Sequence, residues 1–297
     1  MENPRLDGIE LTHADRVLFP EQGITKLDLA RYFDKMGASM LEHAANRLVS
    51  LVRCPQGRDG KCFFQRHAGS GLPEAFRRKS VREKDGGTAE YLYFTGKKAL
   101  IAAAQMGVLE LHIWGSKVDD IERPDRLVFD LDPGEGVDFA AVKRAAIHVR
   151  SVLEGFDIGS FPLLTGGKGI HVVAPLVRRH EWPVVSAFAA AVAKRMAGED
   201  PKRYVATVSK AERKGRIFID YLRNDRSGTA IAPFSPRARA GAPLAWPVGW
   251  EMLDDIEAAD RFRLTEADPA AANGWAGYGG LRQSLKADAL EEVGVET

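Results

Sequence analysis

Apolar and polar positions alternate with two different periods along this 297-residue chain, which predicts a mixture of helices and strands. Residues 25–40 begin with a capping-box pair, Thr25 and Asp28, and continue with apolar side chains every three or four positions, so we expect a helix with one buried face. Short apolar runs typical of strands occupy 48–53, 62–66, 89–94 and 109–114, and a short helix is expected near 97–106.

From Arg126 onward the pattern reads strand, helix, strand, strand, helix, strand. Asp138 is placed to cap the first of these helices, and Pro183 suits the first turn of the second. We therefore expect a four-stranded sheet backed by two helices in this part, and the α+β (mixed α/β) class for the whole chain. The organisation we expect is a single domain, 1–297, with an N-terminal lobe at 1–120, a core at 121–252 and a C-terminal extension at 253–297.

Composition constrains the function only loosely. Hydrophobic residues make up 45% of the chain, enough for a sizeable core, and 42 basic against 41 acidic residues give a net charge of +1. A uniformly basic protein is excluded, so contact with nucleic acid must come from local clusters. Arg53, Lys61 and Arg66 belong to one such cluster, whereas we interpret residues 77–79 as a solvated face.

Only two cysteines occur, Cys54 and Cys62, which favours free thiols on neighbouring strands and a reducing compartment. With His67 they lack the regular spacing of a zinc site. The sequence shows no basic-then-apolar signal and no apolar run of membrane-spanning length, so we expect no membrane partner and a cytoplasmic, nucleoid-associated location.

Candidate chemistry first appears at 128–133, where an apolar run ends as Val-Phe-Asp-Leu-Asp-Pro. Because side chains alternate along a strand, Asp130 and Asp132 point to the same side. Their mutual repulsion is relieved by a divalent cation, and Mg²⁺ binds carboxylates together with phosphate oxygens. The pair indicates a metal-dependent phosphoryl-transfer site; the alternative is a solvated strand end leading into a turn.

Two further segments carry related chemistry. Residues 163–171, Leu-Leu-Thr-Gly-Gly-Lys-Gly-Ile-His, place a glycine-rich turn between two strands, where backbone N–H groups, Lys168 and His171 suit phosphate oxygens. This is not a Walker loop, and the alternative is a plain hairpin turn. Asp220 ends another apolar run at 216–222, where a charge needs a metal ion or a partner such as arginine.

Together these segments resemble the archaeo-eukaryotic primase superfamily, and most closely the polymerase domain of bacterial ligase D, an end-joining repair enzyme. The resemblance runs through 11–20, 25–30, 63–67, 110–112, 122–126, 130–133, 163–171, 219–221 and 235–239. Thr165 stands where the family is expected to have serine, and the hydroxyl is retained. The resemblance implies a primase-polymerase fold, with an RRM-like catalytic core sheet and an N-terminal α/β lobe that binds the DNA end and template.

The activity that the resemblance implies is template-dependent nucleotidyl transfer, with Asp130, Asp132 and Asp220 as the catalytic residues that hold two Mn²⁺ or Mg²⁺ ions. Primers would be extended with NTP or dNTP, with ribonucleotides favoured. The DNA would be a gapped or broken duplex end with a 5′-phosphate, filled during bacterial non-homologous end joining. Ku and a DNA ligase are the candidate protein partners.

The resemblance also assigns individual contacts. Nucleotide-binding residues would be Thr165, Lys168, His171, His112, Arg216, Arg237 and Arg239. Arg16 and Lys26 match positions that bind the 5′-phosphate of a downstream strand. Consecutive strand residues face opposite sides, so either Phe63 or Phe64 is expected to face solvent as a stacking platform for a template base. The alternative is that both rings are covered. Their basic neighbours Arg53 and Arg66 complete the expected DNA-binding set.

Three other functions stay open. Asp-x-Asp also occurs in glycosyltransferases, but no Gly-x-Gly-x-x-Gly turn opens a helix ahead of it here. A two-metal nuclease shares the acidic cluster without needing the phosphate-binding turn. A catalytically silent DNA-end-binding module would retain the fold, and metal-dependent nucleotide incorporation distinguishes it from an enzyme.

Overall fold

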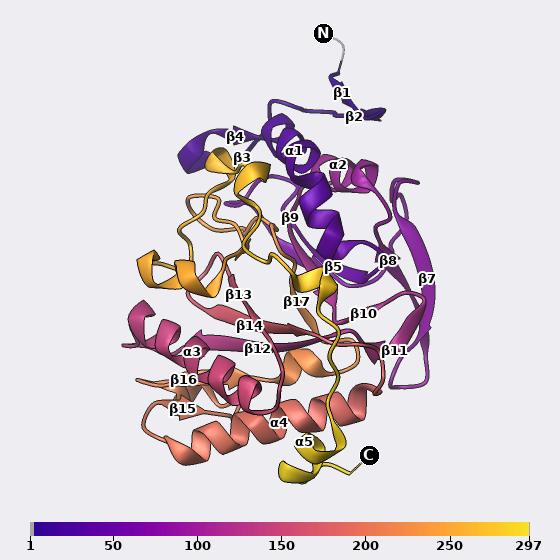
Figure 1. Ribbon diagram of the computed structural model, residues 1–297. Coiled ribbons are helices and arrows are strands. Elements are labelled where there is room, and N and C mark those ends of the chain that lie inside the picture. The colour runs from indigo at the N-terminus through magenta and orange to yellow at the C-terminus, as the bar shows by residue number, and fades with distance from the viewer. Residues whose placement is uncertain (1–2, 297) are drawn as a thin grey trace. The chain divides into compact units, whose positions relative to one another are not determined.

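The computed structural model describes residues 3–296, apart from the side chain of Lys210, and divides into two compact units (Figure 1). The first unit contains the chain up to Trp114 together with Ile231–Ala245 and Phe262–Ala272. The second contains Gly115–Ala230, Trp246–Arg261 and the chain from Asn273 onward. The stretch expected as one extension at 253–297 is therefore divided, because Leu264 is buried in the first unit and Leu290 in the second.

The first unit is built on a sheet with the order β9-β5-β8-β7, to which β6 adds by pairing with β5. These strands are β5 (Leu48–Arg53), β6 (Phe63–Gln65), β7 (Arg77–Arg82), β8 (Thr88–Tyr93) and β9 (Val108–Trp114). The short strand β17 (Thr229–Ile231) lies where the chain passes from the second unit back to the first. Two short hairpins precede them, β1 (Arg5–Leu6) with β2 (Ile9–Glu10) and β3 (Val17–Phe19) with β4 (Ile24–Thr25).

Helices α1 (Lys26–Ala44) and α2 (Lys97–Gln105) pack against each other in this unit. The capping box of Thr25 and Asp28 is present at the start of α1, and the apolar stripe of this helix is buried, as predicted. Residues 77–79, interpreted as a solvated face, form part of β7. β7 is an edge strand that pairs only with β8, and edge strands commonly carry charged side chains.

The second unit has a sheet with the order β15-β16-β12-β14-β13-β18. Its strands are β12 (Arg126–Pro133), β13 (Phe161–Leu164), β14 (Ile170–Pro175), β15 (Tyr204–Val205), β16 (Ile217–Asp220) and β18 (Trp246–Pro247). The four expected strands are thus extended by two short edge strands. Helices α3 (Phe139–Gly155) and α4 (Trp182–Glu199) both pack against β12, and Asp138 caps α3 as predicted. The hairpin β10 (Ser116–Lys117) with β11 (Asp120–Pro124) and the helix α5 (Ala287–Glu292) complete the unit.

The two cysteines are not free thiols: Cys54 and Cys62 form a disulfide, with their Cα atoms 4.3 Å apart. The physical reason is the antiparallel register of β5 and β6, in which Arg53 pairs with Phe63. The residues that follow and precede this pair therefore face each other. The expectation of free thiols was wrong, and the argument for a reducing compartment that rested on it no longer holds.

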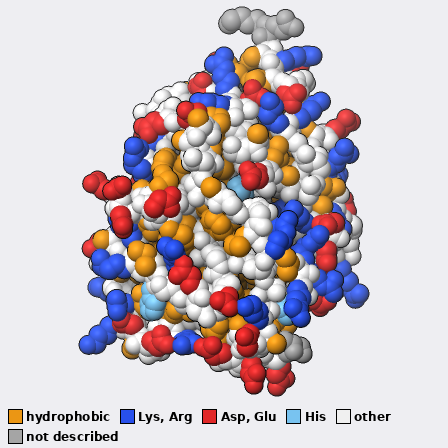
Figure 2. Space-filling view, in the orientation of Figure 1, with side chains coloured by type: hydrophobic (Ala, Val, Ile, Leu, Met, Phe, Trp, Pro, Cys, Tyr) orange, Lys and Arg blue, Asp and Glu red, His pale blue; other side chains and the backbone are white. Residues whose placement is uncertain are grey.

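Basic and acidic side chains are interspersed over the face shown in Figure 2, in agreement with the balanced charge of the sequence. Among the described residues, no helix is both long enough and apolar enough to cross a membrane.

Candidate active site

Three aspartates meet on the sheet of the second unit. Strand β12 lies between β14 and β16, and Asp130 pairs with His171 on one side and with Asp220 on the other. Paired residues share a face of the sheet, and Asp132 lies two positions further along β12, so all four side chains emerge on the same face. One carboxylate oxygen from each aspartate lies within 4.8 Å of the other two.

Arg223 lies against this cluster, although it was not predicted to be a site residue. It belongs to the 3₁₀ turn Leu222–Asn224 that follows β16. Its Nη2 lies 3.0 Å from Oδ2 of Asp130 and 3.1 Å from Oδ2 of Asp220. Arg216, one of the expected nucleotide-binding residues, donates to the carbonyl oxygen of Pro201 at 3.3 Å. The available signal was the position of Arg223, one helical turn after Asp220.

The environment gives the three carboxyl groups different proton affinities. Burial, together with the charge of Asp130, raises the pKa of Asp132 to about 6. Burial also raises the pKa of Asp220, although Arg223 opposes this. Burial has the same tendency at Asp130, but His171 and Arg223 outweigh it and lower that pKa. One arginine does not balance three carboxylates, and this crowded set of oxygen donors fits a hard divalent cation.

The backbone of the glycine-rich turn lies close to the backbone of β12 beside the acids. A Cβ atom added to Gly169 would lie 2.4 Å from the carbonyl oxygen of Leu131, so only glycine fits there. The hydroxyl of Thr165 donates to the carbonyl oxygen of Gly169 at 2.9 Å and fixes the other end of the turn. Lys168, at the tip, is exposed. The turn therefore presents a lysine at a rigid position.

His171 connects this turn to the acidic cluster. It is 3% exposed, and its Nε2 lies 3.3 Å from Oδ1 of Asp130. Its Nδ1 is buried and has no hydrogen-bond partner within the part of the chain that the structure describes. Buried polar atoms are usually satisfied, so this nitrogen is suited to a bound ligand.

Two of the expected nucleotide-binding residues lie together in the first unit. His112 on β9 has its Nε2 2.8 Å from Oε2 of Glu110, and Nε of Arg237 lies 3.2 Å from Oε1 of the same carboxylate. Arg239, the alternative to Arg237, is exposed. The sequence pattern alone does not select Glu110 as a site residue, although it lies in the matching segment 110–112.

The two residues expected to bind a 5′-phosphate also lie near each other in the first unit. Lys26 occupies the first turn of α1, and its Nζ donates to the carbonyl oxygen of Thr12 at 2.7 Å. Arg16 donates to the carbonyl oxygen of Pro55 at 2.9 Å. Burial lowers the pKa of Lys26, and the charge of Arg16 lowers it further. Two cations beside a helix N-terminus are suited to an anion.

Both aromatic rings of β6 are exposed, Phe63 by 41% and Phe64 by 51%, so the alternative in which both are covered is wrong. The guanidinium of Arg53 lies over the ring of Phe63 at 5.3 Å, and Phe64 makes an edge contact with His112 at 5.8 Å between ring centroids. Arg66, the last member of the expected DNA-binding set, is exposed. The strand therefore offers two rings and positive charge to solvent.

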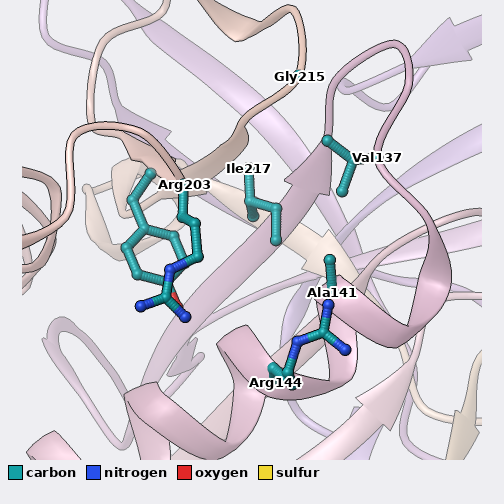
Figure 3. A pocket seen from close by; sticks show the side chains of 7 residues that line it. Val137, Ala141, Arg144, Arg203, Gly215 and Ile217 are labelled. Carbon is teal, nitrogen blue, oxygen red and sulfur yellow. The ribbon is translucent and has the colours of Figure 1, made fainter.

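A small cavity in the second unit is shown in Figure 3. It is lined by Ile217 of β16 and by Ala141 and Arg144 of α3, with Arg203 at its opposite side. Ile217 is three positions from Asp220, and strand alternation therefore turns the two side chains to opposite faces. This cavity is not part of the acidic site.

Comparison with known proteins agrees with this geometry. The sequence model of the LigD primase-polymerase domain family matches residues 25–274. The multifunctional non-homologous end joining protein LigD of Pseudomonas aeruginosa is 34% identical over 97% of this chain and 35% of its own length. The corresponding Mycobacterium tuberculosis protein is 36% identical over 83% of this chain and 34% of its own length. The chain thus spans about a third of these relatives.

A solved structure extends the comparison to the fold. The polymerase domain of Mycobacterium tuberculosis Ligase D, in complex with DNA, superposes with a TM-score of 0.80 at 32% sequence identity, covering 87% of this chain and 92% of that one. The mixed α/β class predicted from the sequence is confirmed. The chain belongs to the LigD primase-polymerase domain family, a family of nucleotidyltransferases.

Proposed function

We propose that this protein extends DNA primers and fills short gaps at double-strand breaks during bacterial non-homologous end joining, by template-dependent nucleotidyl transfer. The observation that carries the proposal is the approach of Asp130, Asp132 and Asp220 to within 4.8 Å of one another. The names of the relatives support end joining as the process, and the DNA-bound Mycobacterium tuberculosis domain supports DNA as the partner. Ku and a DNA ligase are the protein partners that this process implies.

The proposed roles follow from the chemistry of each group. Asp130, Asp132 and Asp220 would hold two divalent ions, Mn²⁺ or Mg²⁺, which lower the pKa of a primer 3′-hydroxyl and offset the charge of a triphosphate. Phosphoryl transfer depends on positioning and charge compensation rather than on a covalent nucleophile. Lys168 and His171 would bind phosphate oxygens next to the acids. In the absence of metal, Arg223 would compensate part of their charge.

The test is extension of a gapped, 5′-phosphorylated duplex with each ribonucleotide and deoxyribonucleotide, in Mn²⁺ or Mg²⁺. Asp220→Asn keeps the size of the side chain and removes a carboxylate, so we expect a loss of at least about 100-fold in rate. Asp200→Asn is the control, because that carboxylate pairs with Arg203 at the surface. Normal extension by D220N would refute the metal assignment. A wild-type protein that binds ends but incorporates nothing would be a silent end-binding module.

The preference for ribonucleotides is part of the same test. It is implied by the family resemblance and not by any contact described above. Faster incorporation of the ribonucleotide at equal concentration supports it, and equal rates for both sugars would refute it.

A further inference from the structure

Glu110 is a charged residue placed inside the first unit. It lies on β9 two positions before His112, so the two side chains project from the same face of the strand. The Glu110 side chain is 9% exposed. Burial of a charge is unfavourable unless the charge is paired and hydrogen-bonded, so this carboxylate needs partners inside the unit.

Both carboxylate oxygens of Glu110 are engaged. Oε2 lies 2.8 Å from Nε2 of His112, and since an ionised carboxylate only accepts, this imidazole nitrogen is the donor. Oε1 accepts the backbone N–H of Ala238 at 2.9 Å and forms an ion pair with Nε of Arg237 at 3.2 Å. One side chain on β9 thereby holds a histidine of the same strand and an arginine from a segment more than 120 residues later.

Glu110 stays ionised in this setting. Burial alone would raise its pKa, but the hydrogen bond with His112 and the charge of Arg237 outweigh burial and set the pKa at about 2. A fixed negative charge between two donors keeps both in place. Arg239, two residues after Arg237, is exposed, so Glu110 distinguishes between the two arginines of this loop.

We propose that Glu110 is a positioning residue for the incoming nucleotide, which holds His112 and Arg237 at a fixed separation so that both bind the nucleotide. The inference rests on the nucleotide-binding role expected for these two residues. Long side chains lose rotamer freedom when they bind a ligand, and a carboxylate that orders them beforehand reduces this loss. Glu110 itself carries the same sign of charge as the triphosphate and does not contact it.

The test is Glu110→Gln, which retains the length of the side chain and removes its charge. Nucleotide affinity is measured by equilibrium titration with ATP, and KM and kcat by gap filling. We expect the dissociation constant and KM to rise about tenfold while kcat changes less than about twofold. This pattern indicates the loss of an interaction that is equally strong in the bound substrate and in the transition state. Glutamine still accepts from Ala238 but leaves Arg237 without its counter-charge, so we expect a lower melting temperature in a protein that remains folded.

The matched control is Glu83→Gln. Glu83 is also a carboxylate of the first unit that contacts a histidine, with Oε1 3.1 Å from Nε2 of His67 and 2.8 Å from the hydroxyl of Tyr91. We expect KM for the nucleotide to be unchanged in this variant. An equal rise of KM in E83Q and E110Q would refute a specific positioning role.

Arg237→Ala separates positioning from general support of the fold. If Glu110 acts through Arg237, then E110Q introduced into the R237A protein should raise KM by no more than about threefold, since interacting residues are not additive. A rise as large as in the wild-type background would overturn the proposal. If E110Q does not fold, Glu110→Asp, which keeps the charge and shortens the side chain, is used in the same cycle.

Failure of this inference is distinguishable from failure of the proposed function. A wild-type protein that neither binds ATP nor extends primers would refute the proposed function itself. Wild-type protein that does both, with E110Q indistinguishable from it, would refute only the positioning role.

Discussion

Asp130 is the direct cross-strand partner of Asp220 in the antiparallel pair of β12 and β16. Like charges placed opposite each other on one face destabilise a sheet, so the pairing depends on a nearby cation. In the described residues this cation is the guanidinium of Arg223, which contacts both carboxylates. Arg223, which lies just after β16, therefore offsets the repulsion between these two carboxylates.

Replacement of Arg223 by glutamine should destabilise the metal-free protein. Removal of one partner from a buried ion pair leaves an uncompensated charge, and we expect a loss of about 2–4 kcal/mol in unfolding free energy. Mn²⁺ should restore most of the loss by supplying positive charge to the same carboxylates. Thermal melts in EDTA and in Mn²⁺ measure both effects. Arg216→Gln is the control, and equal destabilisation of the two variants would contradict the assignment.

Asp132 predicts a pH dependence of stability. Its pKa is raised to about 6 in the folded protein, above the ordinary value of 3.8 for an aspartate carboxyl. The folded state thus binds the proton more tightly, and the stability gained from it is present below about pH 4 and is lost as the pH rises through 6. In EDTA, Asp132→Asn should be more stable than wild type by about 2 kcal/mol at pH 7 and should show no advantage at pH 4.

Denaturant melts at several pH values measure this difference. A constant gap between D132N and wild type from pH 4 to pH 7 would show that the carboxyl titrates normally.

Lys26 should matter most when the downstream strand carries a 5′-phosphate. Its buried ammonium group lies beside Arg16 at the start of α1, a setting suited to an anion. We expect Lys26→Ala to reduce gap filling next to a 5′-phosphate about tenfold more than extension of a plain primer-template. The control is Lys35→Ala, whose Nζ contacts the carbonyl oxygen of Ala267. Equal losses of K26A on both DNA substrates would remove the end-recognition role.

Phe64 should contribute to the binding of an unpaired template. Its ring is 51% exposed, and stacking of one base on an aromatic ring contributes about 1–3 kcal/mol. Phe64→Ala should weaken binding of a duplex with a single-stranded overhang by about 5-fold to 150-fold, and binding of a blunt duplex much less. Fluorescence anisotropy measures both affinities. Ile147→Ala, another exposed apolar side chain, should have no effect.

Local patterns were sufficient to predict the elements with strong signals. The capping box at Thr25 and the apolar spacing after it identify α1, and the apolar run ending at Asp130 and Asp132 identifies β12. These features depend on neighbours in the sequence, so the sequence alone reveals them. The convergence of Asp220 with the other two acids was inferred from chemistry and family resemblance, and the register of β16 brings it about.

The features that were not predicted depend on partners that are distant in the sequence. The charged strand β7 forms because β8 pairs with it, and the disulfide forms because the β5–β6 register brings Cys54 opposite Cys62. Arg223 and Glu110 are ordinary charged residues until the fold places them against Asp130 and Arg237. The alternation of side chains indicates which face of a strand a residue occupies but does not identify the residue that pairs with it. The sequence therefore offers at most a local hint, such as the position of Arg223 just after Asp220.

The Cys54–Cys62 disulfide closes the hairpin that leads directly into Phe63 and Phe64. Reduction of this disulfide would remove a covalent constraint that limits the conformational freedom of the unfolded hairpin. Samples purified with and without a thiol are thus two chemically different proteins at the place where the two rings emerge. DNA affinities measured for this protein are comparable only when the oxidation state of the hairpin has been fixed and recorded.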